Sequence, residues 1–167
     1  MPIVGLEPAV KPACLTTKSR RIAVLATEHS LSSDMFLDTA ARYAEDVEVV
    51  KVVGEGFVEL VEGDMECTAE AEHLVRKAVG PLVSMGVDKL VLGCTHYPFL
   101  RPTIERVVAG SGIEVIDSGA AVARRVEWLL ERYDIAAERD SLPVMRFITF
   151  ADEGYRHRLE AKAERIM

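Results

Sequence analysis

The stretch AEAEHLVRKAVGPLVSMGVDKLVLG, residues 69–93, contains a helix followed by a short strand. Between residues 69 and 85 the apolar side chains recur at helical spacing and form one stripe. Its members are Ala71, Leu74, Val75, Ala78, Val79, Leu82 and Val83. Gly86 stands where a helix C-terminal cap belongs, and residues 89–92 form the next strand. A helix that leads directly into a strand is one unit of an α/β fold.

The same alternation continues along most of the chain. Further strands are predicted at residues 3–6, 22–26, 47–53, 113–116 and 145–150, and further helices at residues 33–43, 120–133 and 153–166. Most of the strand segments are apolar throughout, which is typical of strands that are buried on both faces of a parallel sheet. We therefore predict an α/β fold, a layered parallel β-sheet flanked by helices with right-handed crossovers.

Composition and charge exclude several classes of function. A chain of 167 residues suits one domain with a small appendage. Its formal charge of −7 repels phosphate backbones, so we expect no nucleic-acid partner. No apolar run approaches the ~20 residues of a membrane helix, and we expect no membrane partner. Three cysteines without a framework spacing fit a reducing compartment, and no signal peptide is visible. We therefore expect a cytoplasmic protein.

The residues that carry chemistry follow the predicted strand at residues 89–92. The strand ends at Gly93, and Cys94, Thr95 and His96 come next. Ligands of open parallel sheets bind at the carboxyl ends of the strands. A thiol acts as a base only as the thiolate, which a nearby cation or a helix N-terminus stabilises. His96 and the helix predicted near residue 100 are placed to provide both.

The residues alone leave other interpretations open. A cysteine after a buried strand is commonly a small core residue, and a histidine beside it commonly caps a turn. A zinc site built from Cys67, His73, Cys94 and His96 is conceivable, but these spacings match no standard zinc finger. A cysteine–histidine hydrolase would need an orienting group and an oxyanion hole, and neither is visible.

Several segments resemble one family. Residues 93–100, Gly-Cys-Thr-His-Tyr-Pro-Phe-Leu, resemble the signature around the second catalytic cysteine of glutamate racemases, which belong to the cofactor-independent aspartate/glutamate racemase superfamily. Residues 3–9, 22–27, 58–62 and 116–119 resemble other segments of that family in the same order and spacing. Together these segments span about residues 3–125 of the chain.

The resemblance implies an isomerase that interconverts L- and D-glutamate for peptidoglycan synthesis, without metal, pyridoxal phosphate or another cofactor. Two cysteines on opposite faces of the substrate α-carbon exchange its proton. Cys94 would be one of them, His96 would tune its protonation, and Glu62 would be the acidic partner of His96. Thr95 and His96 would contact the substrate, and Thr27 would contact a substrate carboxylate.

Each of these positions also has a structural interpretation. Without the resemblance, Glu62 is an exposed acidic residue in a turn, and Thr27 caps the next helix. Asp117 and Ser118 are expected to cap the helix that begins near residue 120. Ser30, which would join Thr27 at a carboxylate, is open to the same interpretation.

The chain also departs from the family. We find no Cys-Asn-Thr segment for the first catalytic cysteine, and Cys14 and Cys67 match no catalytic position. We therefore expect residues 1–20 to belong to a missing first domain. Residues 21–133 would form the racemase-type domain, and residues 134–167 would be a linker and a returning strand and helix.

Segments that would pack on a missing domain expose apolar surface, so we expect a homodimer or association through that surface. A two-fold dimer would place two copies of Cys94 face to face. Whether the chain is active alone stays open. The alternatives are a non-catalytic module that binds small carboxylates, and a racemase for aspartate or another small acidic substrate.

Overall fold

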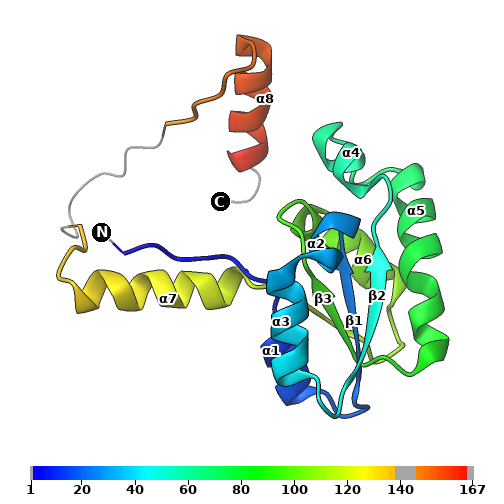
Figure 1. Ribbon diagram of the computed structural model, residues 1–167. Helices are drawn as coiled ribbons and strands as arrows, with labels where there is room; N and C mark the ends of the chain where they lie inside the picture. Colours follow the sequence, from blue (N-terminus) through cyan, green and yellow to red (C-terminus); the bar gives the residue numbers. More distant parts are fainter. Residues whose placement is uncertain (1, 138–145, 165–167) are drawn as a thin grey trace. The chain divides into compact units, whose positions relative to one another are not determined.

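A computed structural model describes residues 2–137 and 146–164 of the chain. The chain contains a parallel sheet with the strand order β2-β1-β3-β4, of which Figure 1 labels β2, β1 and β3. The strands are β1 (Arg21–Ala26), β2 (Glu48–Val53), β3 (Lys89–Leu92) and β4 (Glu114–Ile116). Because every neighbouring pair is parallel, all four strands end at the same edge of the sheet. The predicted α/β fold is confirmed.

Helices cover both faces of this sheet. The helices of the described residues, whether or not they contact the sheet, are α1 (Val10–Thr16), α2 (Glu28–Ser32), α3 (Asp34–Tyr43), α4 (Phe57–Glu62), α5 (Ala69–Val79), the 3₁₀ helices η1 (Gly80–Met85) and η2 (Tyr97–Leu100), α6 (Arg101–Val107), α7 (Gly119–Arg132) and α8 (Glu153–Glu164). Side chains alternate along β1, because successive residues of a strand point to opposite faces. Ala23 and Leu25 pack with α4, α5 and α6, whereas Ile22 and Val24 pack with α1 and α3.

The chain divides into two compact units, up to Leu129 and from Leu130 onward. The first unit contains the sheet and both apolar cores. The second contains α8, a helix with no buried residues. The domain boundaries predicted at residues 20 and 133 stay predictions. None of the helices in the described part of the chain is long and apolar enough to cross a membrane.

Two predicted strands are wrong. Residues 3–6 form no strand, and Ile3 is 92% exposed. Of the segment at residues 145–150, residue 145 lies outside the described residues and residues 146–150 form no strand. Both segments are apolar enough to suggest a strand, but within the described residues neither has a neighbouring strand to pair with.

Prolines explain two further differences at helices. The helix predicted over residues 69–85 changes after Val79 into the 3₁₀ helix η1, because Pro81 cannot donate a backbone hydrogen bond. The predicted cap, Gly86, does adopt the left-handed conformation. The sequence analysis predicts no helix near residue 10, where Pro8 and Pro12 lie close together. Pro12 instead lies in the first turn of α1, where no intrahelical acceptor is needed.

Helix α1 packs on the sheet and on α3, and its Val10 and Ala13 are fully buried. Burial also raises the pKa of the Cys14 thiol, which makes this cysteine a poor nucleophile. The chain then turns into β1, and Asp88 holds this turn. Its carboxylate accepts hydrogen bonds from the Thr17 hydroxyl at 2.5 Å and from the Lys18 amide at 2.6 Å.

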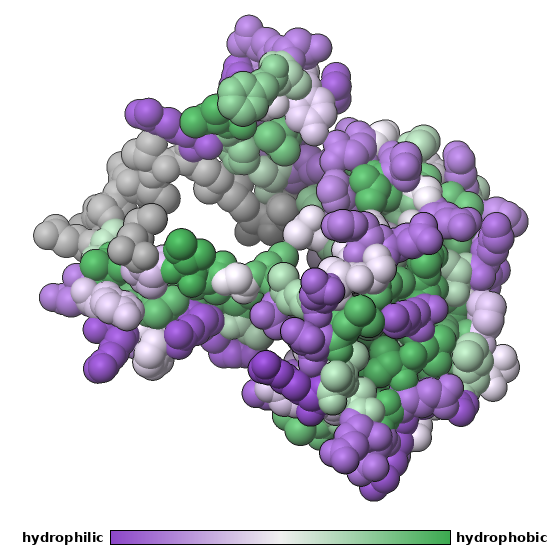
Figure 2. Space-filling model, viewed as in Figure 1, coloured by the Kyte–Doolittle hydropathy of each residue, from purple (hydrophilic) through white to green (hydrophobic). Residues whose placement is uncertain are grey.

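Large apolar side chains are exposed outside the two cores. Trp128 on α7 is about half exposed, and Ile3, Ile148 and Phe150 are almost fully exposed. Figure 2 shows the apolar side chains that lie along the surface of α7. The sequence analysis expected exposed apolar surface of this kind. Such residues are common at surfaces that associate with another protein.

The Asp88 carboxylate is expected to make stability depend on acid. Burial raises its pKa, but hydrogen bonds from Thr17, Lys18 and Ser19 outweigh burial and lower the pKa from 3.8 to about 2. Between pH 2 and pH 3.8 the unfolded chain therefore binds more protons than the folded chain. The stabilisation that the Asp88 carboxylate gives to the folded chain is complete above pH 3.8 and is lost as the pH falls towards 2.

Asp88→Ala should lower the free energy of unfolding by about 1–3 kcal/mol at pH 7, because the carboxylate accepts several hydrogen bonds. Urea unfolding of the variant and the wild type at a series of pH values measures this difference, which should shrink below pH 3.8. Asp38→Ala, at an exposed position of α3, is the control. A difference that is constant down to pH 2 would contradict the prediction.

Candidate active site

The loop after β3 leaves the sheet at a close contact between two strands. The Gly93 amide donates a hydrogen bond to the Leu25 carbonyl at 2.8 Å, which extends the β1–β3 pairing by one residue. A Cβ at position 93 would lie only 3.0 Å from the Cβ of Ala26. A side chain there would push the strands apart, so glycine sets the point from which Cys94 projects.

Cys94, His96 and Glu62 form a continuous chain of polar contacts. The Cys94 Sγ lies 3.8 Å from His96 Nδ1, and His96 Nε2 lies 2.7 Å from Glu62 Oε1. A carboxylate can only accept, so Nε2 carries the proton that it donates to Glu62. The facing Nδ1 is then free to accept the thiol proton of Cys94. The three side chains can therefore work as one acid/base unit.

Glu62 is the last residue of α4, where the sequence alone indicated an exposed acidic turn. The prediction of a turn at this residue is wrong. The exposure of the side chain, 48%, is as expected for a surface acid. Leu60 and Val61 are buried in the core, and this packing directs the end of α4 towards the loop after β3. The His96 side chain is less exposed, at 31%.

Tyr97 anchors this loop. Its ring is fully buried and packs edge-on against Phe57, with 5.3 Å between ring centroids. Its hydroxyl donates a hydrogen bond to the Gly54 carbonyl at 3.2 Å. Burial raises the pKa of Tyr97, and Cys94 and Glu59 raise it further, so the phenol remains a donor. The anchor thus joins the His96 loop to the segment that leads into α4.

A cavity of about 500 Å³ opens at the strand ends. The segments that follow β1, β3 and β4 line it, together with the segment before α1. The lining residues are Leu6, Glu7, Pro8, His29, Ser30, Ser33, Met35, Phe36, Leu92, Gly93, Cys94, Thr95, Pro98, Asp117, Ser118 and Gly119. This position agrees with the predicted one, at the carboxyl ends of parallel strands.

The structure brings only some of the predicted site residues to the cavity. Cys94, Thr95 and Ser30 line it. Thr27 does not belong to the lining among the described residues. Its hydroxyl instead caps α2 by accepting from the Ser30 amide at 3.2 Å. His96 contacts the cavity lining through Cys94.

Asp117 lies on the rim of the cavity in a fixed position. One carboxylate oxygen accepts from Arg101 Nη1 at 2.6 Å, and the other accepts from the Gly119 amide at 2.8 Å. The second contact joins Asp117 to the amide two residues further on, at the first residue of α7, as in an Asx turn. Arg101 also donates to the Val115 carbonyl at 2.9 Å. The rim after β4 is therefore tied to α6.

His29 is a cavity residue that the sequence analysis did not single out. It is exposed and lies on the short helix α2, directly before Ser30. A single histidine in a polar segment has no spacing to other chemical groups that would mark it as part of a site. Only the resemblance of residues 22–27 to the family, extended to the residues that follow, pointed to this region.

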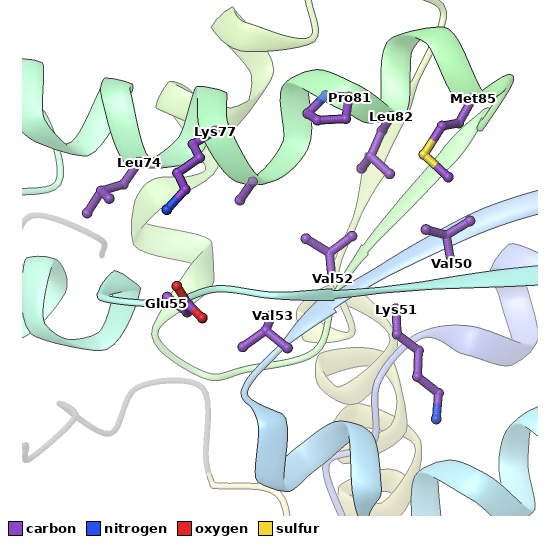
Figure 3. A pocket seen from close by; sticks show the side chains of 11 residues that line it. Val50, Lys51, Val52, Val53, Glu55, Leu74, Lys77, Pro81, Leu82 and Met85 are labelled. Atoms are coloured by element: carbon purple, nitrogen blue, oxygen red, sulfur yellow. The ribbon is translucent and has the colours of Figure 1, made fainter.

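The other candidate sites are weaker. Within the described residues, no cluster of His, Cys, Asp and Glu side chains could hold a metal ion, so the zinc arrangement considered above is not formed. A second cavity, of about 400 Å³, lies between β2 and the α5–η1 segment (Figure 3). Its lining is mostly apolar, with Glu55 and Lys77 at one end and no cysteine or histidine.

Comparison with known proteins identifies the family. The model of the Asp/Glu/hydantoin racemase family matches residues 1–126. The chain belongs to this family. The match contains every strand of the sheet and the whole Cys94 loop. The proteins that give this family its name are racemases, a class of isomerases.

Several relatives of the chain are glutamate racemases. The protein from Pseudomonas putida is 44% identical over 151 residues, which cover 90% of this chain and 56% of the relative. The glutamate racemase from Herpetosiphon aurantiacus is 40% identical over 152 residues, or 91% of this chain and 59% of the relative. The chain therefore spans little more than half the length of these curated relatives.

Solved structures show the same fold. Escherichia coli glutamate racemase, in a complex with L-glutamate and the activator UDP-MurNAc-Ala, matches with a TM-score of 0.70 and 33% identity, and covers 78% of this chain and 50% of that one. A glutamate racemase isoform from Bacillus anthracis matches with a TM-score of 0.76 and 26% identity, over 93% of this chain and 59% of that one.

The anchor of the site loop gives a test of its packing. A Cβ at Gly54 would lie 2.5 Å from the Tyr97 hydroxyl oxygen and 2.7 Å from the ring. Gly54→Ala should therefore lower the free energy of unfolding by about 1–3 kcal/mol, as is usual for overpacked cores. Urea denaturation measures the change, and Gly5→Ala, with no atom within 4 Å of its Cβ, is the control. Equal stability of both variants would contradict this packing.

Proposed function

We propose that this chain provides one acid/base face of a glutamate racemase site. The observation that supports the proposal is the Cys94–His96–Glu62 chain at a cavity of amino-acid size. In this proposal Cys94 exchanges the substrate proton, His96 accepts or returns the thiol proton, and Glu62 stabilises the charge on His96. The reaction would supply D-glutamate for peptidoglycan synthesis in the cytoplasm.

The proposed step is a proton transfer. The Cys94 thiolate takes the proton from the α-carbon, and the electron pair of that C–H bond moves into the α-carboxylate. The product of this step is a thiol and a carbanion that the substrate carboxylate delocalises. The carbanion forms only in a site with fixed dipoles and little water. In this proposal Thr95, which follows Cys94 on the cavity wall, holds that carboxylate.

Inversion needs a second acid on the opposite face of the α-carbon. Cys94 is the only thiol among the described residues that line the cavity. We infer that a partner supplies the second group, either a second copy of this chain with its own Cys94 or another racemase domain. The exposed apolar side chains at Ile3 and Trp128 support such an association. Without a partner, the proton returns to the face that it left.

The substrate assignment rests on the relatives. The family name includes aspartate and hydantoin racemases, whereas the relatives and structures described above are glutamate racemases. Glutamate is therefore the proposed substrate, and aspartate is the competing one.

Incubation of the chain with L-glutamate in deuterium oxide tests Cys94. The wild type should replace the α-proton with deuterium, and Cys94→Ala should slow this exchange at least about 100-fold, because acid/base groups contribute about 10²–10⁴. Proton NMR follows the exchange, and optical rotation follows inversion. Cys67→Ala, an exposed thiol outside the cavity, should exchange as the wild type does.

The outcomes separate the possible roles. Exchange with inversion means that a second acid is present, and exchange with retained configuration means that Cys94 acts without a partner. A folded wild type that binds glutamate without exchange would contradict catalysis and favour a carboxylate-binding module. Faster exchange with aspartate than with glutamate would contradict the substrate assignment.

Glu62 should act as a positioning residue for His96. Glu62→Gln removes the negative charge that stabilises a protonated imidazole at 2.7 Å, so the maximal exchange rate should fall about tenfold or more. The glutamate concentration for half-maximal rate should stay the same, because Glu62 does not contribute to the described cavity lining. Glu59→Gln, exposed on the same helix, is the control. A change in the half-maximal concentration alone would contradict this role.

A further inference from the structure

The charges around the cavity are unbalanced for an acidic substrate. Its described lining includes two acidic residues, Glu7 and Asp117, but no lysine or arginine. Arg101 already pairs with Asp117 and therefore balances that charge. An acidic amino acid carries two carboxylates, and anions are bound in proteins by cations or by several hydrogen-bond donors. His29 is the one side chain of the described lining that can carry a positive charge.

The cavity hydroxyls after β1 already have partners within the protein. Ser33 donates from Oγ to the Ser30 carbonyl at 2.8 Å and accepts from the Phe36 amide at 3.3 Å. The Ser30 Oγ lies 2.9 Å from the Thr27 Oγ1, with which it shares a hydrogen bond. In the described part of the chain, the His29 ring has no hydrogen bond that would have to break when a ligand binds.

We propose that His29 donates a ring N–H to the side-chain carboxylate of the amino-acid substrate and thereby selects acidic side chains. The inference rests on the proposed function and names the group that would recognise the substrate side chain. Imidazole presents an N–H donor in either protonation state, and a carboxylate beside it favours the charged form. The result is a charge-assisted hydrogen bond.

The topology separates the two carboxylates of the substrate. Cys94 must reach the α-carbon, so the α-carboxylate lies beside Cys94. Thr95, the next residue, is then the one that binds this carboxylate. The distal carboxylate extends away from Cys94 towards another strand end. The strands on either side of β3 are β1 and β4. The segment after β4 brings the Asp117 carboxylate to the cavity, whereas the segment after β1 brings His29, the group that can hold an anion. Glu7, on the segment before α1, leaves a negative charge at the same cavity for the substrate ammonium group.

Isothermal titration calorimetry of the purified chain with L-glutamate and L-glutamine tests this assignment. His29→Ala should weaken the binding of glutamate about tenfold, the usual loss for a hydrogen bond to a charged group. It should change the affinity for glutamine by no more than about twofold, because the amide provides no charged acceptor. His29→Lys should keep the preference for glutamate, since a cation is restored.

His73→Ala is the matched control, because His73 is exposed on α5 and does not contribute to the described cavity lining. Its affinities should equal those of the wild type. Circular dichroism verifies the fold of each variant, and His29 is exposed, so its replacement leaves the core intact.

Three results would overturn the assignment. Unchanged glutamate binding by His29→Ala overturns it and leaves the proposed function in place if deuterium exchange persists. An equal loss of glutamate and glutamine binding overturns it as well, because His29 then shapes the cavity without selecting charge. A folded wild type that binds neither amino acid overturns both the assignment and the proposed function.

Discussion

The contact between Gly93 and the end of β1 is the constraint on which the site depends. The Gly93 amide pairs with Leu25, and the missing side chain lets the two strands approach at Ala26. The register of the parallel sheet therefore continues up to the residue before Cys94. Since all four strands run in the same direction, the segments after β1, β3 and β4 meet at one cavity. The chemistry of the site is a consequence of strand pairing.

The acid/base unit depends on packing on the other side of that loop. Tyr97 directly follows His96, and its buried ring and its hydrogen bond to Gly54 hold the loop against the segment before α4. The same core positions α4 so that Glu62 reaches His96. A side chain that is half exposed is thus held in place by neighbours that are fully buried. The proton-transfer role that we propose for Cys94 rests on two contacts, 3.8 Å and 2.7 Å long.

The sequence predicted the features that depend on local pattern. Apolar segments of β-branched residues marked all four strands, and Gly86 marked the end of the η1 segment. The strand predicted at residues 3–6 failed because pairing depends on a neighbouring strand, which no local pattern reports. Helix α1 was not predicted. Its Pro12 would interrupt the interior of a helix, but the first helical turn tolerates proline.

The candidate site was predicted only in part, because local pattern reports some of its residues and tertiary packing brings the others to them. Cys94 and Thr95 follow a recognisable strand, and the resemblance to the family named Glu62 and His96 as partners. The 34 positions that separate Glu62 from His96 are bridged only by tertiary packing. His29 gave no signal, because the role that we propose for it depends on which loops the topology brings together and on which cavity donors already have partners.

Nitrogen-15 chemical-shift mapping of the chain with L-glutamate tests the central claim most directly. The account predicts that the perturbed amides cluster at residues 93–96, at residues 29–30 and at residues 117–119, around the cavity at the strand ends. Perturbations confined to the β2, α5 and η1 segments, around the second cavity, would contradict it.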